Sequence, residues 1–162
     1  MEKSSAFTVE FSADLHRRLP IEESFDCVST VFDLKQGQGE LIFIDGFAKD
    51  EVMEKIMEHM MKLDPLAEDS VSGWLARQIP YLEVEGTTDL AQAVDAVLSG
   101  TLLFLAEGAQ EAVLIDARSY PVRSMQEPED DRVLRGSRDA FVETLIFNTA
   151  LIRRRIRDPK LI

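Results

Sequence analysis

The chain has 162 residues, 45% of them hydrophobic, which is enough to bury a core in one domain or in two small subdomains. Its net charge of −12 is uneven: residues 1–117 hold 8 basic and 23 acidic side chains, a net of −15, and residues 118–162 hold 10 and 7, a net of +3. An acidic body argues against a nucleic-acid binder, because such proteins gain affinity by neutralising phosphates. A single cysteine, Cys27, excludes an internal disulfide.

Residues 1–79 are predicted to form a first small α/β subdomain. Cys27 lies in an apolar, alternating segment, so we expect a buried thiol rather than a nucleophile. His16 and His59 have no partner at metal-ligand spacing, and we interpret both as ordinary histidines. The predicted elements are a helix or arm over 6–18, a strand hairpin from 25–34 and 40–45 around a glycine-containing turn, and helices over 49–63 and 69–79.

Four methionines in the helix predicted over 49–63 allow two interpretations. Met53, Met57, Met60 and Met61 recur at spacings of three and four around Ile56. Such spacing favours packing against a core. Methionine is also common on adaptable binding surfaces, and that alternative stays open.

Residues 80–162 are predicted to form a second α/β subdomain, with Ile79-Pro80 as the boundary. A short strand over 81–85 precedes a helix that Thr88 or Asp89 caps and Ser99-Gly100 ends. Strands over 102–106 and 112–117 and a long C-terminal helix complete the order. The expected architecture is therefore α/β: two subdomains, each a short mixed sheet with packed helices, the second ending in a long helix.

The last part of the chain has an unusual charge pattern. Acidic residues from Glu127 to Asp131 precede a stretch of arginines and small residues, and an apolar run over 141–152 leads to Arg153, Arg154, Arg155 and Arg157. Two interpretations compete. The helix is a buried central element with solvated arginines at its C-terminal end, or the arginines lie beside anionic lipid headgroups ahead of a membrane segment.

Several blocks of the chain resemble the GerA family of bacterial spore germination proteins. The C-terminal block carries RGSRD followed by an apolar run and NTALIRRRIRD, and three upstream blocks over 41–52, 93–105 and 112–123 occur in the family's order. Ala140 departs from the family pattern, which usually has glycine there. Within the family, the stage V sporulation AF type resembles this chain more than the nutrient-receptor A subunits do. The motif residues are Arg135, Gly136, Ser137, Arg138, Asp139 and Asn148.

The resemblance implies a cytosolic N-terminal domain of a spore inner-membrane protein. Its function would be subunit assembly, or coupling of a signal to ion release, during germination. The implied partners are other germination-protein subunits, further copies of the chain, and the membrane, through apolar segments expected to follow Ile162. Nucleic acid is not among them. Arg153, Arg154, Arg155 and Arg157 would be the membrane-proximal, partner-binding residues.

No pattern of catalytic residues stands out in the sequence. It holds no phosphate-binding loop with a lysine, no nucleophile elbow and no metal-spaced Cys/His group, so we expect no enzyme, no metal and no cofactor. Asp116 and Arg118 are interpreted as a structural ion pair. Gly136-Ser137-Arg138 could hold an anion or simply cap a helix. The alternative function is a stand-alone module that binds a small ligand.

Overall fold

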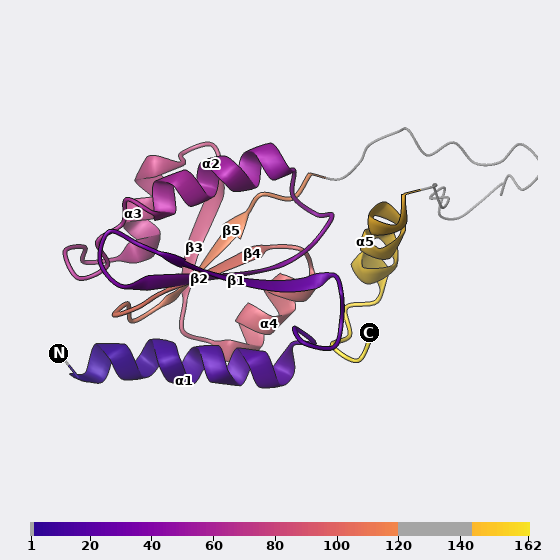
Figure 1. The fold of residues 1–162 in the computed structure, drawn as a ribbon, viewed down its shortest axis with the longest axis horizontal. Helices are drawn as coiled ribbons and strands as arrows, with labels where there is room; N and C mark the ends of the chain where they lie inside the picture. The colour runs from indigo at the N-terminus through magenta and orange to yellow at the C-terminus, as the bar shows by residue number, and fades with distance from the viewer. Residues whose placement is uncertain (1, 120–143) are drawn as a thin grey trace, which may run out of the picture.

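A computed structural model shows a three-layer α/β/α arrangement, with a sheet between helices on both faces and helix α5 at one end of the sheet (Figure 1). It describes residues 2–119 and 144–162, and in the first helix the side chains from Thr8 on. The elements in chain order are α1 (Glu2–Arg18), β1 (Cys27–Asp33), β2 (Gln38–Ile44), α2 (Asp50–Met60), α3 (Val71–Gln78), β3 (Glu83–Thr87), α4 (Leu90–Leu98), β4 (Leu102–Ala106), β5 (Ala112–Asp116) and α5 (Leu145–Arg155).

The sheet is antiparallel throughout, in the order β1-β2-β4-β5-β3. Its inner strand β4 reads as a continuous apolar run, because both of its faces are covered: Leu103 and Leu105 face one layer of helices, and Leu102 and Phe104 face the other. The α/β class is confirmed. The expectation of two separate mixed sheets is wrong, because Leu41 of β2 pairs with Phe104 of β4 and so joins the two halves of the chain.

Each face of the sheet has its own hydrophobic core. Helices α1 and α4 cover one face, with Leu15 and Val97 fully buried there, and α2 and α3 cover the other, with Ile56 and Leu75 fully buried (Figure 1). Cys27 lies in the first core at 2% exposure, as expected. Burial raises the pKa of its thiol to about 11, more than the nearby Arg153 lowers it, so the thiol is neutral at physiological pH.

The predicted element boundaries hold closely through the described chain. Asp89 caps α4 by accepting hydrogen bonds from the backbone N–H groups of Ala91 and Gln92, at 2.8 and 3.4 Å. Gly100 ends that helix with φ of +95°. A Cβ on Gly100 would lie 2.4 Å from the ring of Phe47, so only glycine fits. The predicted division between residues 79 and 80 stays a prediction, and the sheet continues across it.

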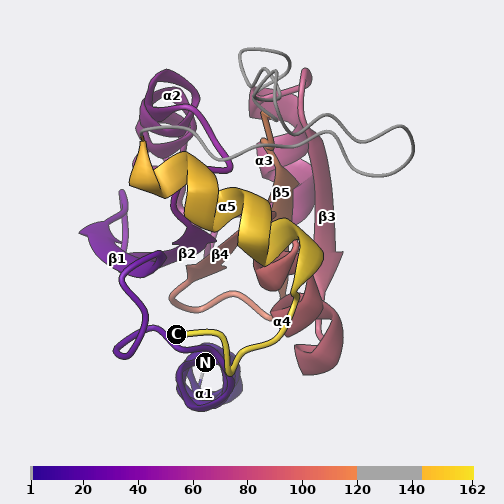
Figure 2. The ribbon, with the colours of Figure 1, turned by 90° about the vertical axis from the view of Figure 1, so that its right-hand side faces the viewer.

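The C-terminal helix differs most from expectation. Helix α5 covers 11 residues, and it lies across one end of the sheet rather than inside a core (Figures 1 and 2). Leu145, Ile146 and Phe147 are 64%, 39% and 40% exposed, and only Ala150 and Arg153 are buried. The interpretation of this helix as a buried central element is therefore wrong.

Candidate functional site: the docking site of the C-terminal helix

Helix α5 packs on loops at one end of the sheet, and close approach there depends on Gly46. This residue follows β2 with φ of +90°. A Cβ on it would lie 2.7 Å from Cγ2 of Ile146 and 3.1 Å from its carbonyl oxygen. Ala150, one turn further along α5, joins the core beneath α1 and α4. Gly46 therefore provides the surface on which α5 rests.

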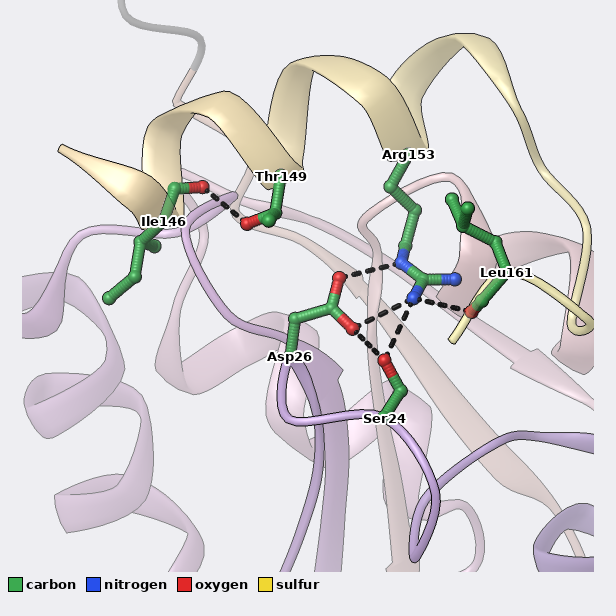
Figure 3. Close-up of polar contacts among 6 residues, drawn as sticks. All are labelled: Ser24, Asp26, Ile146, Thr149, Arg153 and Leu161. Atoms are coloured by element: carbon green, nitrogen blue, oxygen red, sulfur yellow. Dashed lines mark hydrogen bonds and ion pairs between the residues drawn. The ribbon is translucent and has the colours of Figure 1, made fainter. Parts of the chain in front are cut away.

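A buried ion pair fixes the C-terminal end of α5 to the body of the protein. Arg153 Nε donates to Asp26 Oδ2 at 2.7 Å, and Nη2 donates to Asp26 Oδ1 at 2.8 Å, a bidentate geometry (Figure 3). Nη2 also donates to Ser24 Oγ at 3.1 Å and to the carbonyl oxygen of Leu161 at 2.9 Å. Arg153, Asp26 and Ser24 are 2%, 3% and 6% exposed. We call these three side chains the latch.

The latch is built around a charged carboxylate. Burial raises the pKa of Asp26, but hydrogen bonds from Arg153 and Ser24 and the positive charge of Arg153 outweigh it, so the pKa lies below its ordinary value. The backbone carbonyl of Asp26 accepts from the N–H of Asp45 at 2.7 Å, which ties the latch to the turn beneath α5. Nη1 of Arg153 is buried with no hydrogen-bond partner in the described part of the chain. The guanidinium thus holds α5 to Asp26 and Ser24 through Nε and Nη2.

The four arginines predicted to lie near a membrane do not share one environment. Arg153 points inward, into the latch, whereas Arg154, Arg155 and Arg157 are exposed. Ile156, between them, is 48% exposed. Arg153 follows the buried Ala150 by three positions, so both lie on the face of α5 that meets the body, and a run of consecutive arginines does not by itself show this difference. Asp26 was missed as a partner, although it directly precedes the predicted buried residue Cys27.

The other predicted motif residues mostly lie outside the described residues. Arg135, Gly136, Ser137, Arg138 and Asp139 fall in the stretch 120–143, and so does the anion site considered there. Asn148 lies on α5 and is half-buried. Asp116 and Arg118 form the predicted ion pair, and hydrogen bonds from Arg118 lower the pKa of the Asp116 carboxyl.

A second polar cluster joins α1 to the sheet. Glu40 of β2 accepts hydrogen bonds from Ser12 of α1 and Ser29 of β1, both at 2.6 Å, and pairs with His16. Burial raises the pKa of Glu40, but these bonds outweigh it and the pKa lies below its ordinary value. His16, interpreted as an ordinary surface histidine, thus has a carboxylate partner.

The structure also has an apolar groove and a polar cavity. The groove, of about 610 Å³, lies between α2 and the β1–β2 hairpin. The four methionines of the predicted cluster differ there: Met60 is buried in the core, whereas Met53, Met57 and Met61 line the groove. The cavity, of about 380 Å³, carries both charges, with Glu83, Glu85, Asp95 and Asp116 beside Arg118 and Arg157.

Residues 2–119 and 144–162 hold no group of three or more His, Cys, Asp or Glu side chains placed to bind a metal ion. Within the same ranges, every helix is too short or too polar to cross a bilayer.

Comparison of folds gives the class of protein. The fold matches the crystal structure of the N-terminal domain of the A subunit of the Bacillus megaterium spore germinant receptor GerK3, with a TM-score of 0.60 at 16% identity. The match covers 93% of this chain and 53% of that domain. The chain thus has the fold of about half of a germinant-receptor N-terminal domain.

Comparison of sequences gives the family. The family described as Bacillus/Clostridium GerA spore germination protein matches residues 15–162, and the chain belongs to it. Stage V sporulation protein AF of Bacillus subtilis is 33% identical over 146 residues, which are 89% of this chain and 30% of that protein. Spore germination protein GerLA of Bacillus cereus is 28% identical over 123 residues, 75% of this chain and 25% of that protein. The chain thus spans less than a third of each of these relatives.

Proposed function

We propose that the chain is the cytosolic, membrane-adjacent domain of a spore inner-membrane protein of the GerA family, of the stage V sporulation protein AF type. In this proposal it assembles with other germination-protein subunits, including further copies of itself, and couples a signal to ion release. The 33% identity to stage V sporulation protein AF supports the choice of type. The names of the relatives support a role in germination or sporulation.

The latch is the observation that carries this proposal. It joins α5 to the segment before β1 through Arg153, while Arg154, Arg155 and Arg157 remain exposed around Ile156. Exposed arginines around an apolar side chain suit the boundary of an anionic bilayer, where each basic residue contributes about 1 kcal/mol. A displacement of the membrane segment would then be transmitted through α5 and Asp26 to the sheet.

The membrane role predicts binding to anionic vesicles through the three exposed arginines. Replacing Arg154, Arg155 and Arg157 together by glutamine should weaken association with phosphatidylglycerol vesicles by about 3 kcal/mol, roughly a hundredfold, since each arginine contributes about 1 kcal/mol. Co-sedimentation with vesicles measures this, and the wild-type affinity should fall as salt rises. Arg153 is left unchanged because its substitution would break the latch.

A triple variant on the body supplies the control. It replaces three exposed arginines of α1 and α3 by glutamine: Arg17, Arg18 and Arg77. The net charge changes by the same amount as in the α5 variant, because three arginines are replaced in each. This variant should bind vesicles like the wild type or more weakly by no more than a few-fold. Equal losses in the two triple variants would show that only net charge matters, and would refute a membrane role for α5.

A second candidate function, binding of a small ligand, is favoured by the polar cavity. Glu83, Glu85 and Asp95 line the same cavity of about 380 Å³ as Arg118 and Arg157. Such a mixture suits a small polar molecule that carries both charges. A thermal-shift screen with amino acids and sugars should give a stabilisation that grows with ligand concentration. The same shift in an Asp95→Ala variant would mean that the ligand binds elsewhere.

A further inference from the structure

The groove between α2 and the hairpin has an apolar floor that is open to solvent. Val28 of β1 and Phe43 of β2 are directly paired, so both side chains lie on the sheet face that α2 covers (Figure 1). Met53, Met57 and Met61 form the opposite wall, one turn of α2 apart. Met61 is 52% exposed, although the core next to it buries Met60 completely. A row of partly exposed methionines is unusual in a wall that only needs to close a core.

The rim of this groove is acidic and holds no base. Asp50, Glu54 and Glu58 are exposed and recur every four residues, so they form one ridge of α2 beside the ridge of methionines. Asp45 adds a fourth carboxylate, and the residues lining the groove include no lysine, arginine or histidine. Within residues 2–119 and 144–162, no ion pair involves any of these four carboxylates. Their negative charge is therefore available to a partner.

We propose that this groove binds a basic amphipathic helix of a partner subunit. Met53 and the C-cap residue Met61 are eight positions apart, about 12 Å along the axis of α2, which matches two turns of a bound helix with anchors at i, i+4 and i+7. Methionine side chains adapt to varied apolar anchors. Lysines or arginines beside those anchors would meet the acidic rim, which steers the encounter and fixes the partner's orientation.

This inference rests on the assembly role proposed above, but its failure and a failure of the membrane role can be distinguished. The groove and the site beneath α5 share Asp45 and Gly46, whereas Glu54, Glu58 and Met61 line the groove alone and make no hydrogen bond or ion pair with the latch. Substitutions at Glu54, Glu58 and Met61 therefore leave the latch and the exposed arginines unchanged. A chain could lose peptide binding and keep vesicle binding, or the reverse.

The test uses the whole chain and a synthetic peptide of about 14 residues, with leucines at i, i+3, i+4 and i+7 and lysines elsewhere. Calorimetry should show saturable binding at a ratio of one to one. A scrambled peptide of the same composition, which lacks the apolar face, should bind about tenfold more weakly, because the anchors could no longer enter the groove together.

Variants of the chain locate the site. Glu54→Lys with Glu58→Lys should weaken binding at least about tenfold, because attraction on the rim becomes repulsion. Met61→Glu should weaken it by about fivefold or more, and this position is exposed enough for the variant to fold. The control is Glu22→Lys with Glu23→Lys, an equal charge change at exposed positions outside the groove.

The control variant should bind the peptide within about twofold of the wild type. Binding that falls equally in the groove variants and in the control would mean attraction to the acidic body as a whole, and would overturn the proposal. So would equal affinity for the scrambled peptide, or no saturable binding by the wild-type chain.

Discussion

Replacing Asp26 by asparagine is expected to destabilise the protein by about 3–5 kcal/mol, because it leaves the charge of Arg153 buried without a counter-ion. A small domain is stable by only about 5–15 kcal/mol, so this is a large part of the total. Urea unfolding measures the loss. Asp33→Asn, an exposed position at the end of β1, is the control and should change stability by no more than about 0.5 kcal/mol.

The stability difference between the wild type and Asp26→Asn should also depend on pH, in a direction that the pKa of Asp26 fixes. The pKa of Asp26 is lowered in the folded state, so its stabilising contribution is complete above the unfolded value, about 3.9, and is lost as the pH falls through the folded value. The difference between wild type and Asp26→Asn should be largest near neutral pH. It should shrink below about pH 4. A difference that does not change between pH 7 and pH 3 would show that Asp26 is not acting as a carboxylate.

A double variant tests whether Asp26 and Arg153 contribute to stability through their interaction with each other. When Asp26→Leu is combined with Arg153→Met, neither charge of the latch remains, and the double variant should be more stable than either single variant. Additive losses would instead show that the two residues contribute independently. A single-variant loss no larger than that of Asp33→Asn would show that the ion pair between Asp26 and Arg153 does not stabilise the protein.

Local signals in the sequence predicted the elements well, because the elements depend on near neighbours. The all-apolar run of β4, the Asp89 cap and the hairpin turn before β2 each lie within about ten residues. The pairing of β2 with β4 does not: it joins strands about 60 residues apart, and each strand pattern suits several neighbours equally well. That is why the two halves were predicted as separate sheets.

The candidate site was predictable only in part, for a related reason. A run of arginines indicates a basic end of the chain, and Arg154, Arg155 and Arg157 are indeed exposed. The side chain of Arg153 points inward because it pairs with Asp26, which lies 127 positions earlier in the chain. No local sequence pattern links these two residues. The Asp116–Arg118 pair was predictable because its members are two residues apart on a strand end. Distance along the chain, rather than chemistry, set the limit.

Gly46→Val is expected to release α5 from the end of the sheet while the sheet itself stays folded. A β-branched residue is strained at φ of +90°, which costs about 1–2 kcal/mol, and its side chain would overlap Ile146 on α5, which costs about 1–3 kcal/mol more. The sum is comparable to the free energy that holds one helix in place. Hydrogen exchange should therefore quicken about a hundredfold in α5 and stay slow in β4 and β5.

Gly108 provides a matched comparison, since it has φ of +87° and its added Cβ would lie 2.8 Å from Leu66, a residue that precedes α3. Gly108→Val should carry a similar backbone strain without changing exchange in α5. If both variants quicken exchange throughout the chain, α5 unfolds only together with the sheet. The helix would then be part of one cooperative unit, and a membrane signal arriving at α5 could reach the sheet only by destabilising the whole domain.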